Sequence, residues 1–186
     1  MKKRTILSSA ILLLSAAAML NACKKKKEAD PVVVSPKIAE AKIIPVGVST
    51  VTGLATFTEE SGKVTLKVSI AHAAPGEHGL HLHIGGDCSM GTQTTVAGGH
   101  WNPTSQAHGK WGSASYHRGD VGNITIGNDS TGTLTMTTDL WAVGGSDTTK
   151  NILNHAILFH EKPDDFITQP SGAAGNRLGC GEIKLK

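Results

Sequence analysis

The stretch GLATFTEESGKVTLKVSI, residues 53–70, decides the fold class of this chain. Its second half alternates four apolar residues with three polar ones. The apolar residues are Val64, Leu66, Val68 and Ile70, and the polar ones are Thr65, Lys67 and Ser69. Such alternation is typical of a β-strand with one buried face. Residues 53–58 alternate in the same way, and the glycine-containing segment 59–63 predicts a hairpin loop between two antiparallel strands.

Strand-like patterns recur along the rest of the chain. Residues 132–137 and 182–186 alternate, and residues 152–159 form a nearly continuous apolar run that predicts a central strand. No convincing amphipathic helix follows the first 22 residues, and the chain contains 22 glycines. These features predict an all-β fold, a sandwich or barrel of short strands. Residues 85–122 lack the pattern, and a loop this long is either functional or disordered.

Histidines are concentrated in and around this loop. The segment PGEHGLHLH, residues 75–83, places three histidines within six residues. Because side chains two residues apart on a strand share a face, His81 and His83 would direct two imidazoles to one point. The later candidate ligands are His100, His108, His117, Asp120 and His160. Imidazole is a good ligand for copper and zinc, so the pattern predicts a metal centre.

The candidate ligands divide into two sets by their chemistry. Two histidines of one strand, one histidine of the long loop and His160 would form an all-imidazole set, which suits a redox-active copper ion. His108, His117 and Asp120, together with one shared histidine, would form the tetrahedral shell that zinc prefers. The spacing alone does not show which histidine is shared. His72 and His155 lie outside these patterns, and we interpret them as ordinary surface or core residues.

The N-terminal residues predict export from the cytosol. Residues 1–22 combine a basic start with an apolar stretch broken by serines, which indicates a signal peptide rather than a spanning helix. The segment LNAC, residues 20–23, resembles the lipobox of bacterial lipoproteins, in which the cysteine, here Cys23, is acylated. The alternative is an ordinary secretory signal followed by a chance cysteine. We expect a lipidated polar tether over residues 23–42, and its lysines 24–27 either rest on anionic headgroups or form a soluble spacer.

Cysteine count and charge restrict the remaining choices. With Cys23 assigned to the lipobox, Cys88 and Cys180 remain as a pair, which an oxidising compartment favours as a disulfide over two free thiols. From residue 28 onward the chain has 11 basic and 15 acidic side chains, a net charge of −4. A mildly acidic domain argues against nucleic acid as a partner.

Five segments resemble, in order, motifs of copper/zinc superoxide dismutase, and the first four of them contain metal ligands of the family. They are GLHLH at 79–83, GHWNP at 99–103, HRGDVGN at 117–123, HEK at 160–162 and GNRLGCG at 175–181. The match runs from about residue 45 to the C-terminus, within an expected domain over residues 43–186. The resemblance implies a Greek-key β-sandwich or barrel, immunoglobulin-like, with long metal-binding and electrostatic loops.

The resemblance also implies a role for each ligand. Copper would be held by His81, His83, His100 and His160. Zinc would be held by His100, His108, His117 and Asp120. His100 would then be the shared residue, bridging the two ions, and it would supply a proton to the reduced anion.

Residues outside the ligand sets also match the family. His78 matches a structural histidine that hydrogen-bonds backbone beside the site. Asp164 matches a carboxylate that links a copper histidine to a zinc histidine, here His81 and His108. Arg177 matches the arginine that attracts the anion to copper, and Cys88 with Cys180 matches the family's disulfide. Residues 166–176 carry no charge, so attraction of the anion is expected to be weaker than in many relatives.

These observations predict an extracytoplasmic enzyme that converts superoxide to dioxygen and hydrogen peroxide with copper and zinc as cofactors. It would be attached to a bacterial membrane through lipidated Cys23, on the periplasmic side or at the cell surface. The alternative is a lipid-anchored module that sequesters copper or zinc without useful turnover. The presence of every ligand and of Arg177 favours the enzyme. Whether the chain forms a homodimer stays open.

Overall fold

Nine β-strands form the folded part of the chain that can be described. The computed structural model describes residues 35–88 and 97–186. Within these ranges, no helix is long and apolar enough to cross a membrane. The predicted signal peptide, the predicted lipidation site Cys23 and residues 23–34 of the predicted tether lie outside the described residues.

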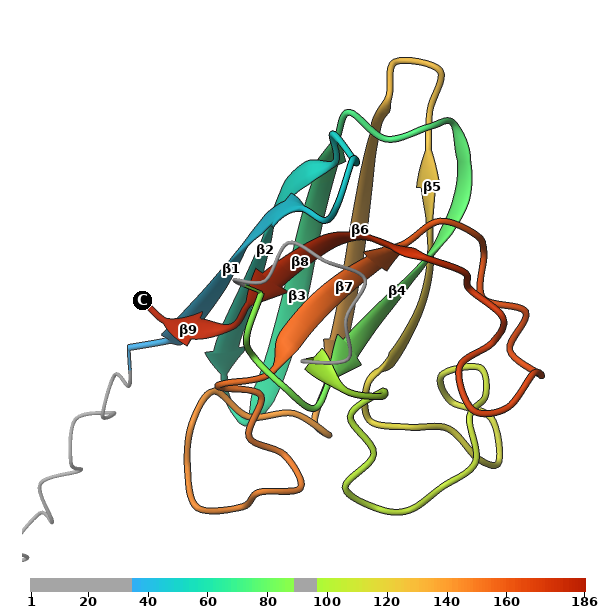
Figure 1. Cartoon of the computed structure of the whole chain (residues 1–186). Coiled ribbons are helices and arrows are strands. Elements are labelled where there is room, and N and C mark those ends of the chain that lie inside the picture. Colours follow the sequence, from blue (N-terminus) through green and yellow to red (C-terminus); the bar gives the residue numbers. More distant parts are fainter. Residues whose placement is uncertain (1–34, 89–96) are drawn as a thin grey trace, which may run out of the picture. The chain divides into compact units, whose positions relative to one another are not determined.

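The strands pair into one sheet that curls on itself. In chain order they are β1 (Lys37–Pro45), β2 (Thr52–Glu60), β3 (Lys63–Ala71), β4 (Gly76–His83), β5 (Asp120–Ile126), β6 (Thr131–Thr138), β7 (Ala156–His160), β8 (Arg177–Glu182) and β9 (Lys184–Leu185). Neighbouring strands are antiparallel and follow the order β5-β4-β7-β8-β1-β2-β3-β6, with β9 beside β1. The result is a nearly closed eight-strand barrel, which confirms the predicted all-β, Greek-key fold (Figure 1).

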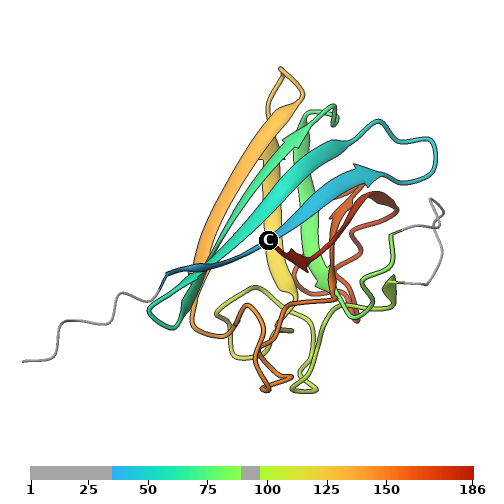
Figure 2. The same cartoon turned by 90° about the vertical axis from the view of Figure 1, so that its left-hand side faces the viewer.

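Strand β1 joins the two halves of the barrel. Residues 37–43 pair with β2, whereas Ile44 and Pro45 pair with β8. The near layer of Figure 2 contains β1, β2, β3 and β6, and the other half contains β4, β5, β7 and β8. A turn after β5 connects the ends of the strand order, where Gly127 N–H donates to Thr131 O at 2.8 Å.

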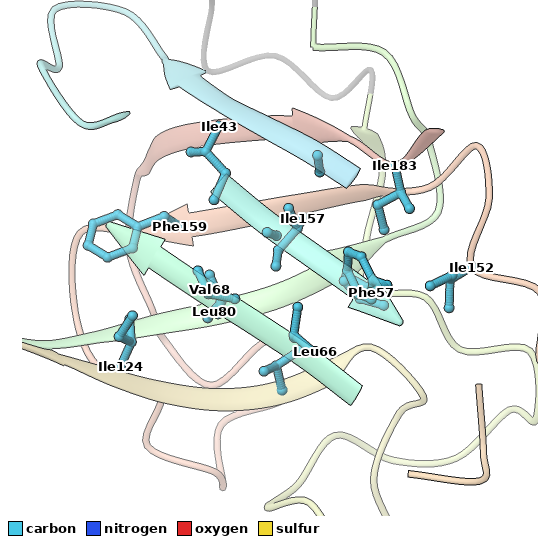
Figure 3. Close-up of a cluster of buried hydrophobic side chains, with 14 of the residues drawn as sticks. Ile43, Phe57, Leu66, Val68, Leu80, Ile124, Ile152, Ile157, Phe159 and Ile183 are labelled. Carbon is cyan, nitrogen blue, oxygen red and sulfur yellow. The ribbon is translucent and has the colours of Figure 1, made fainter. Parts of the chain in front are cut away.

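The core fills the space between the two halves. Val64, Leu66, Val68 and Ile70 of β3 are at most 2% exposed, as their alternation predicted. Figure 3 shows Leu66 and Phe57 in the same cluster as Leu80 of β4 and Ile157 of β7. Burying each such side chain stabilises the fold by about 1.5–3 kcal/mol. Because Leu80 and Leu82 point into this core, His81 and His83 must lie on the outer face of β4.

Three strand boundaries differ from the sequence prediction. The hairpin after β2 needs only Ser61 and Gly62, both with positive φ, because Glu60 already pairs with Lys63. Strand β7 begins at Ala156 and not at residue 152, because Asn154 has a φ of 65° and forms a turn. The predicted loop 85–122 ends early, at Asp120, where β5 begins.

The predicted boundary between tether and domain, after residue 42, falls inside β1, so the domain begins earlier than predicted. Strand β1 begins at Lys37, and its inward residues Ala39, Ala41 and Ile43 are at most 1% exposed. Two of these three are alanines, which give only a weak strand signal. The folded domain therefore includes residues that the sequence assigned to the tether.

A disulfide joins the segment after β4 to strand β8. Cys88 and Cys180 are bonded, with their Cα atoms 5.6 Å apart and 92 residues apart in sequence. Cys180 is buried with Val46, Ala156 and Leu158. The predicted disulfide is confirmed.

Replacing both cysteines, Cys88→Ser with Cys180→Ser, should lower the free energy of unfolding of the metal-free protein by about 4 kcal/mol, because a closed loop of this length restricts the unfolded chain. Guanidinium unfolding at equilibrium measures the change, and reducing the wild-type protein should reproduce it. An unchanged unfolding midpoint would show that the disulfide contributes nothing to stability.

Candidate metal centre

The predicted copper ligands lie together on the outer side of β4 and β7. His81 and His83 face outward from β4, and His160 is the last residue of β7, the neighbouring strand. His100 comes from the long loop and forms an isolated β-bridge with His83. One ring nitrogen from each of the four residues lies within 4.8 Å of the others, and all four residues are buried.

The predicted zinc ligands surround one carboxylate, that of Asp120 at the start of β5. Nδ1 of His100 is 2.7 Å from Oδ1, and Nδ1 of His117 is 3.1 Å from the same oxygen. Nδ1 of His108 is 3.0 Å from Oδ2. The N–H groups of Gly109 and His117 also donate to Oδ2, at 3.1 and 2.8 Å, and hold the carboxylate in place. Three imidazoles and a carboxylate are a donor set that suits zinc.

The ring of His100 lies between the two sets. Its Nδ1 faces Asp120, and its Nε2 is buried without a hydrogen-bond partner. The ring centroid is 3.9 Å from that of His81 on one side and 5.6 Å from that of His117 on the other. The structure therefore places one nitrogen of His100 in each set, the arrangement that the family resemblance implied.

Six buried ring nitrogens lack a partner in hydrogen-bond geometry among the described residues, and two of them, His108 Nδ1 and His117 Nδ1, still lie 3.0 and 3.1 Å from the Asp120 carboxylate. The six are His81 Nδ1, His83 Nε2, His100 Nε2, His108 Nδ1, His117 Nδ1 and His160 Nε2. Leaving a polar atom buried and unpaired costs about 1–3 kcal/mol each. A cation accepts the lone pairs of neutral imidazoles, so the residues present fit a copper ion in the all-imidazole set and a zinc ion in the set around Asp120.

The opposite nitrogens of His81, His83 and His160 are hydrogen-bonded, which sets the tautomers of these three rings. Nδ1 of His83 donates to Gly98 O at 2.9 Å, and Nδ1 of His160 donates to Gly175 O at 3.4 Å. A proton on one nitrogen leaves the lone pair on the other, and such outer partners are how proteins orient metal-binding histidines.

Asp164 connects the two sets from outside. Its Oδ2 accepts from His81 Nε2 at 2.8 Å, and its Oδ1 accepts from His108 Nε2 at 2.9 Å. Asp164 is 2% exposed. The carboxylate thus fixes one ring of each set, in the position that the sequence suggested for it.

Asn123 positions Asp164, a role that the sequence analysis missed. Asp164 N–H donates to Asn123 Oδ1 at 2.7 Å, and Asn123 Nδ2 donates to Asp164 O at 2.9 Å. Asn123 lies on β5, three residues after Asp120. Its only sequence signal was its place within the motif HRGDVGN, where nothing indicated its partner.

His78 supports the backbone beside the site. Its Nδ1 lies 2.8 Å from His160 O, its Nε2 lies 2.9 Å from Ala74 O, and its ring stacks on Phe159 at 4.7 Å. The side chain therefore ties the end of β7 to β4. This agrees with the structural role that the family resemblance implied.

Burial tunes the ligands for metal binding. Burial lowers the pKa of His81 to about 4, against the opposing effect of the Asp164 carboxylate, and it lowers the pKa values of His83 and His160 well below the usual range. These rings are therefore neutral at pH 7, the form that binds metals. Burial also lowers the pKa of His108, but the carboxylates of Asp120 and Asp164 outweigh it and raise that pKa to about 9. Metal binding at His108 should therefore release a proton.

Arg177 lies beside the all-imidazole set. It begins β8 and pairs in register with His160. One of its guanidinium nitrogens donates to Gly98 O at 2.6 Å, and the same carbonyl accepts from His83. The contact fixes a permanent positive charge next to the predicted copper ligands.

A lysine from the long loop lies beside the uncharged segment 166–176. Lys110 Nζ lies 5.7 Å from the ring centroid of Phe166, and the sequence did not reveal this cation beside the segment.

The two histidines outside the predicted patterns make ordinary hydrogen bonds. His72 forms a hydrogen bond with the Thr52 hydroxyl, and His155 donates to Ile84 O. Both histidines lie outside the two ligand sets.

Comparison with known proteins agrees with this geometry. A family model described as copper/zinc superoxide dismutase matches residues 51–183. The chain belongs to the copper/zinc superoxide dismutase family. The family consists of oxidoreductases that act on superoxide, so the expected enzyme class and the copper and zinc cofactors are confirmed. The role of each individual residue stays a prediction.

Among solved structures, this chain is similar to one titled as the crystal structure analysis of the clock protein EA4. The TM-score is 0.71 at 30% sequence identity, and the similarity covers 82% of this chain and 97% of that chain.

The substitution Gly172→Ala should disturb the link between Asp164 and His108. A methyl group at Gly172 would overlap Asp164 Oδ1 and lie 2.7 Å from His108 Nε2, at a φ of 66°. We expect zinc affinity, measured by chelator competition, to fall about 10- to 100-fold, as when other partners of metal ligands are lost.

Gly47→Ala is the matched control. Gly47 has a φ of 64°, and nothing lies within 4 Å of an added methyl group there. Equal zinc affinities in the two variants would contradict the expected effect of the contact with Asp164.

Proposed function

We propose that this chain is an exported superoxide dismutase that converts two superoxide anions and two protons to one dioxygen and one hydrogen peroxide at the four-imidazole set. The observation that carries the proposal is the position of His100, whose two ring nitrogens belong to different ligand sets. Bound copper would supply the alternating one-electron oxidation and reduction of superoxide, and bound zinc would hold the far nitrogen of His100.

His100 has the geometry of a proton donor for the second half-reaction. Because Nδ1 of His100 contacts Asp120, Nε2 on the other side of the ring faces His81 and His83. A proton held at Nε2 would therefore be delivered to a reduced anion next to these residues. The ring is only 5% exposed, which limits its exchange of protons with bulk water.

Arg177 supplies the attraction for the anion. Its guanidinium is fixed by Gly98 O, which also orients His83, so the positive charge and the predicted copper ligand share one carbonyl. A fixed fork of N–H donors suits a small anion. Because the domain as a whole is mildly acidic, local positive charge must provide the steering.

Turnover is tested on purified residues 23–186 loaded with copper and zinc, with a copper-free sample as reference. We expect fast dismutation in the loaded protein and only background in the copper-free sample. Stoichiometric copper and zinc with negligible turnover would instead indicate a sequestration module.

Arg177→Ala should lower kcat/KM for superoxide several-fold or more and flatten its dependence on ionic strength, with copper content unchanged. Lys67→Ala removes the same charge from the outer face of β3 and is the control for net charge. If both variants kept the wild-type rate and salt dependence, Arg177 would have no part in steering.

Membrane attachment through Cys23 is the second part of the proposal. It is supported by the lipobox-like segment LNAC at residues 20–23 and by the disulfide between Cys88 and Cys180, which suits an oxidising compartment. We expect the wild-type chain, expressed in a bacterium with lipoprotein processing, to enter the detergent phase on Triton X-114 partitioning. The Cys23→Ser variant should move to the aqueous phase, and recovery of both proteins in the same phase would contradict lipidation.

A further inference from the structure

A side-chain amide holds the backbone of His108 from across the site. His108 N–H donates to Gln169 Oε1 at 2.9 Å, and Gln169 Nε2 donates to His108 O at 2.9 Å. One amide thus closes a ring of two hydrogen bonds with a single residue. Within the described residues, these are the hydrogen bonds that the backbone of His108 makes.

The segment that carries Gln169 contacts His108 at three points. Asp164 accepts a hydrogen bond from the imidazole, Gln169 bonds the backbone, and Gly172 leaves room for the ring. The segment is closed on itself, because Asp165 N–H donates to Gly172 O at 3.0 Å and Gly172 N–H donates to Thr168 O at 2.7 Å. Gln169 therefore extends from a segment that its own backbone hydrogen bonds hold in place.

We propose that Gln169 is a positioning residue for zinc, which fixes the backbone of His108 so that its Nδ1 faces Asp120. This inference rests on the zinc assignment made under the proposed function. Among the described residues, no hydrogen bond of Gln169 goes to a predicted copper ligand. His81 is oriented by Asp164, His83 by Gly98 O and His160 by Gly175 O. Loss of the Gln169 amide should therefore weaken zinc binding and leave copper binding unchanged.

A side-chain amide matches both hydrogen-bonding groups of the His108 backbone. The backbone of His108 presents one donor and one acceptor, and only a group with both can satisfy them together. Methionine has nearly the same length and shape as glutamine but offers neither a strong donor nor a strong acceptor. Gln169→Met thus removes the hydrogen bonds with little change in packing, and Gln169→Ala removes the side chain as well.

Zinc and copper affinities are measured by chelator competition on the metal-free protein, and cobalt(II) in the zinc site reports ligand geometry through its visible spectrum. In Gln169→Met and Gln169→Ala we expect zinc affinity to fall about 10- to 100-fold with an altered cobalt spectrum. Copper affinity should stay within about 2-fold, since outer partners of the copper ligands are untouched. Gln106→Met is the control, because within the described residues the hydrogen bonds of its side chain go to Thr104 O and to the Ser115 hydroxyl.

The outcomes separate cleanly. Wild-type zinc affinity in both Gln169 variants would overturn the proposal, and so would an equal loss of zinc and copper affinity, which indicates general disruption. Thermal unfolding of the metal-free variants should match that of Gln106→Met. If the wild-type protein bound no zinc at the Asp120 set, the zinc assignment itself would fail, and the role of Gln169 would fall with it.

Discussion

The metal centre depends on one constraint: it buries imidazoles whose inward nitrogens lack a partner in hydrogen-bond geometry among the described residues. Six such nitrogens gather around His100 and Asp120, and two of them lie within 3.1 Å of the Asp120 carboxylate. Each of the other four would cost about 1–3 kcal/mol if it stayed unpaired. A bound metal ion would remove this cost, because neutral imidazoles are good ligands for copper and zinc. The barrel provides the stability that lets the chain hold these groups in place before the metals bind.

On strand β4, successive side chains alternate between the core and the metal centre. Leu80 and Leu82 enter the core while His81 and His83 face outward, so these two ligands sit on a strand that is anchored in the core. Two loops then cover this outer face, one with His100, His108 and His117 and one with Asp164. Because Asp164 bonds one ring of each set, the loops and both ligand sets form one connected unit.

Sequence was sufficient where the signal is local or the residue type is rare. Alternation at residues 64–70 predicted β3, and the histidine segments predicted both ligand sets that the structure assembles. Sequence failed where the partner is distant. Strand β1 was missed because Ala39 and Ala41 give a weak signal and its partners lie in β2 and β8. Asn123 and Gln169 were missed because an amide shows its partner only once the loops are folded.

Anomalous diffraction at the copper and zinc absorption edges, from crystals of the protein loaded with both metals, tests the central claim most directly. The account predicts a zinc peak among His100, His108, His117 and Asp120. It predicts a separate copper peak among His81, His83 and His160, on the opposite side of the His100 ring. Both metals at one site, or a peak at other residues, would contradict it.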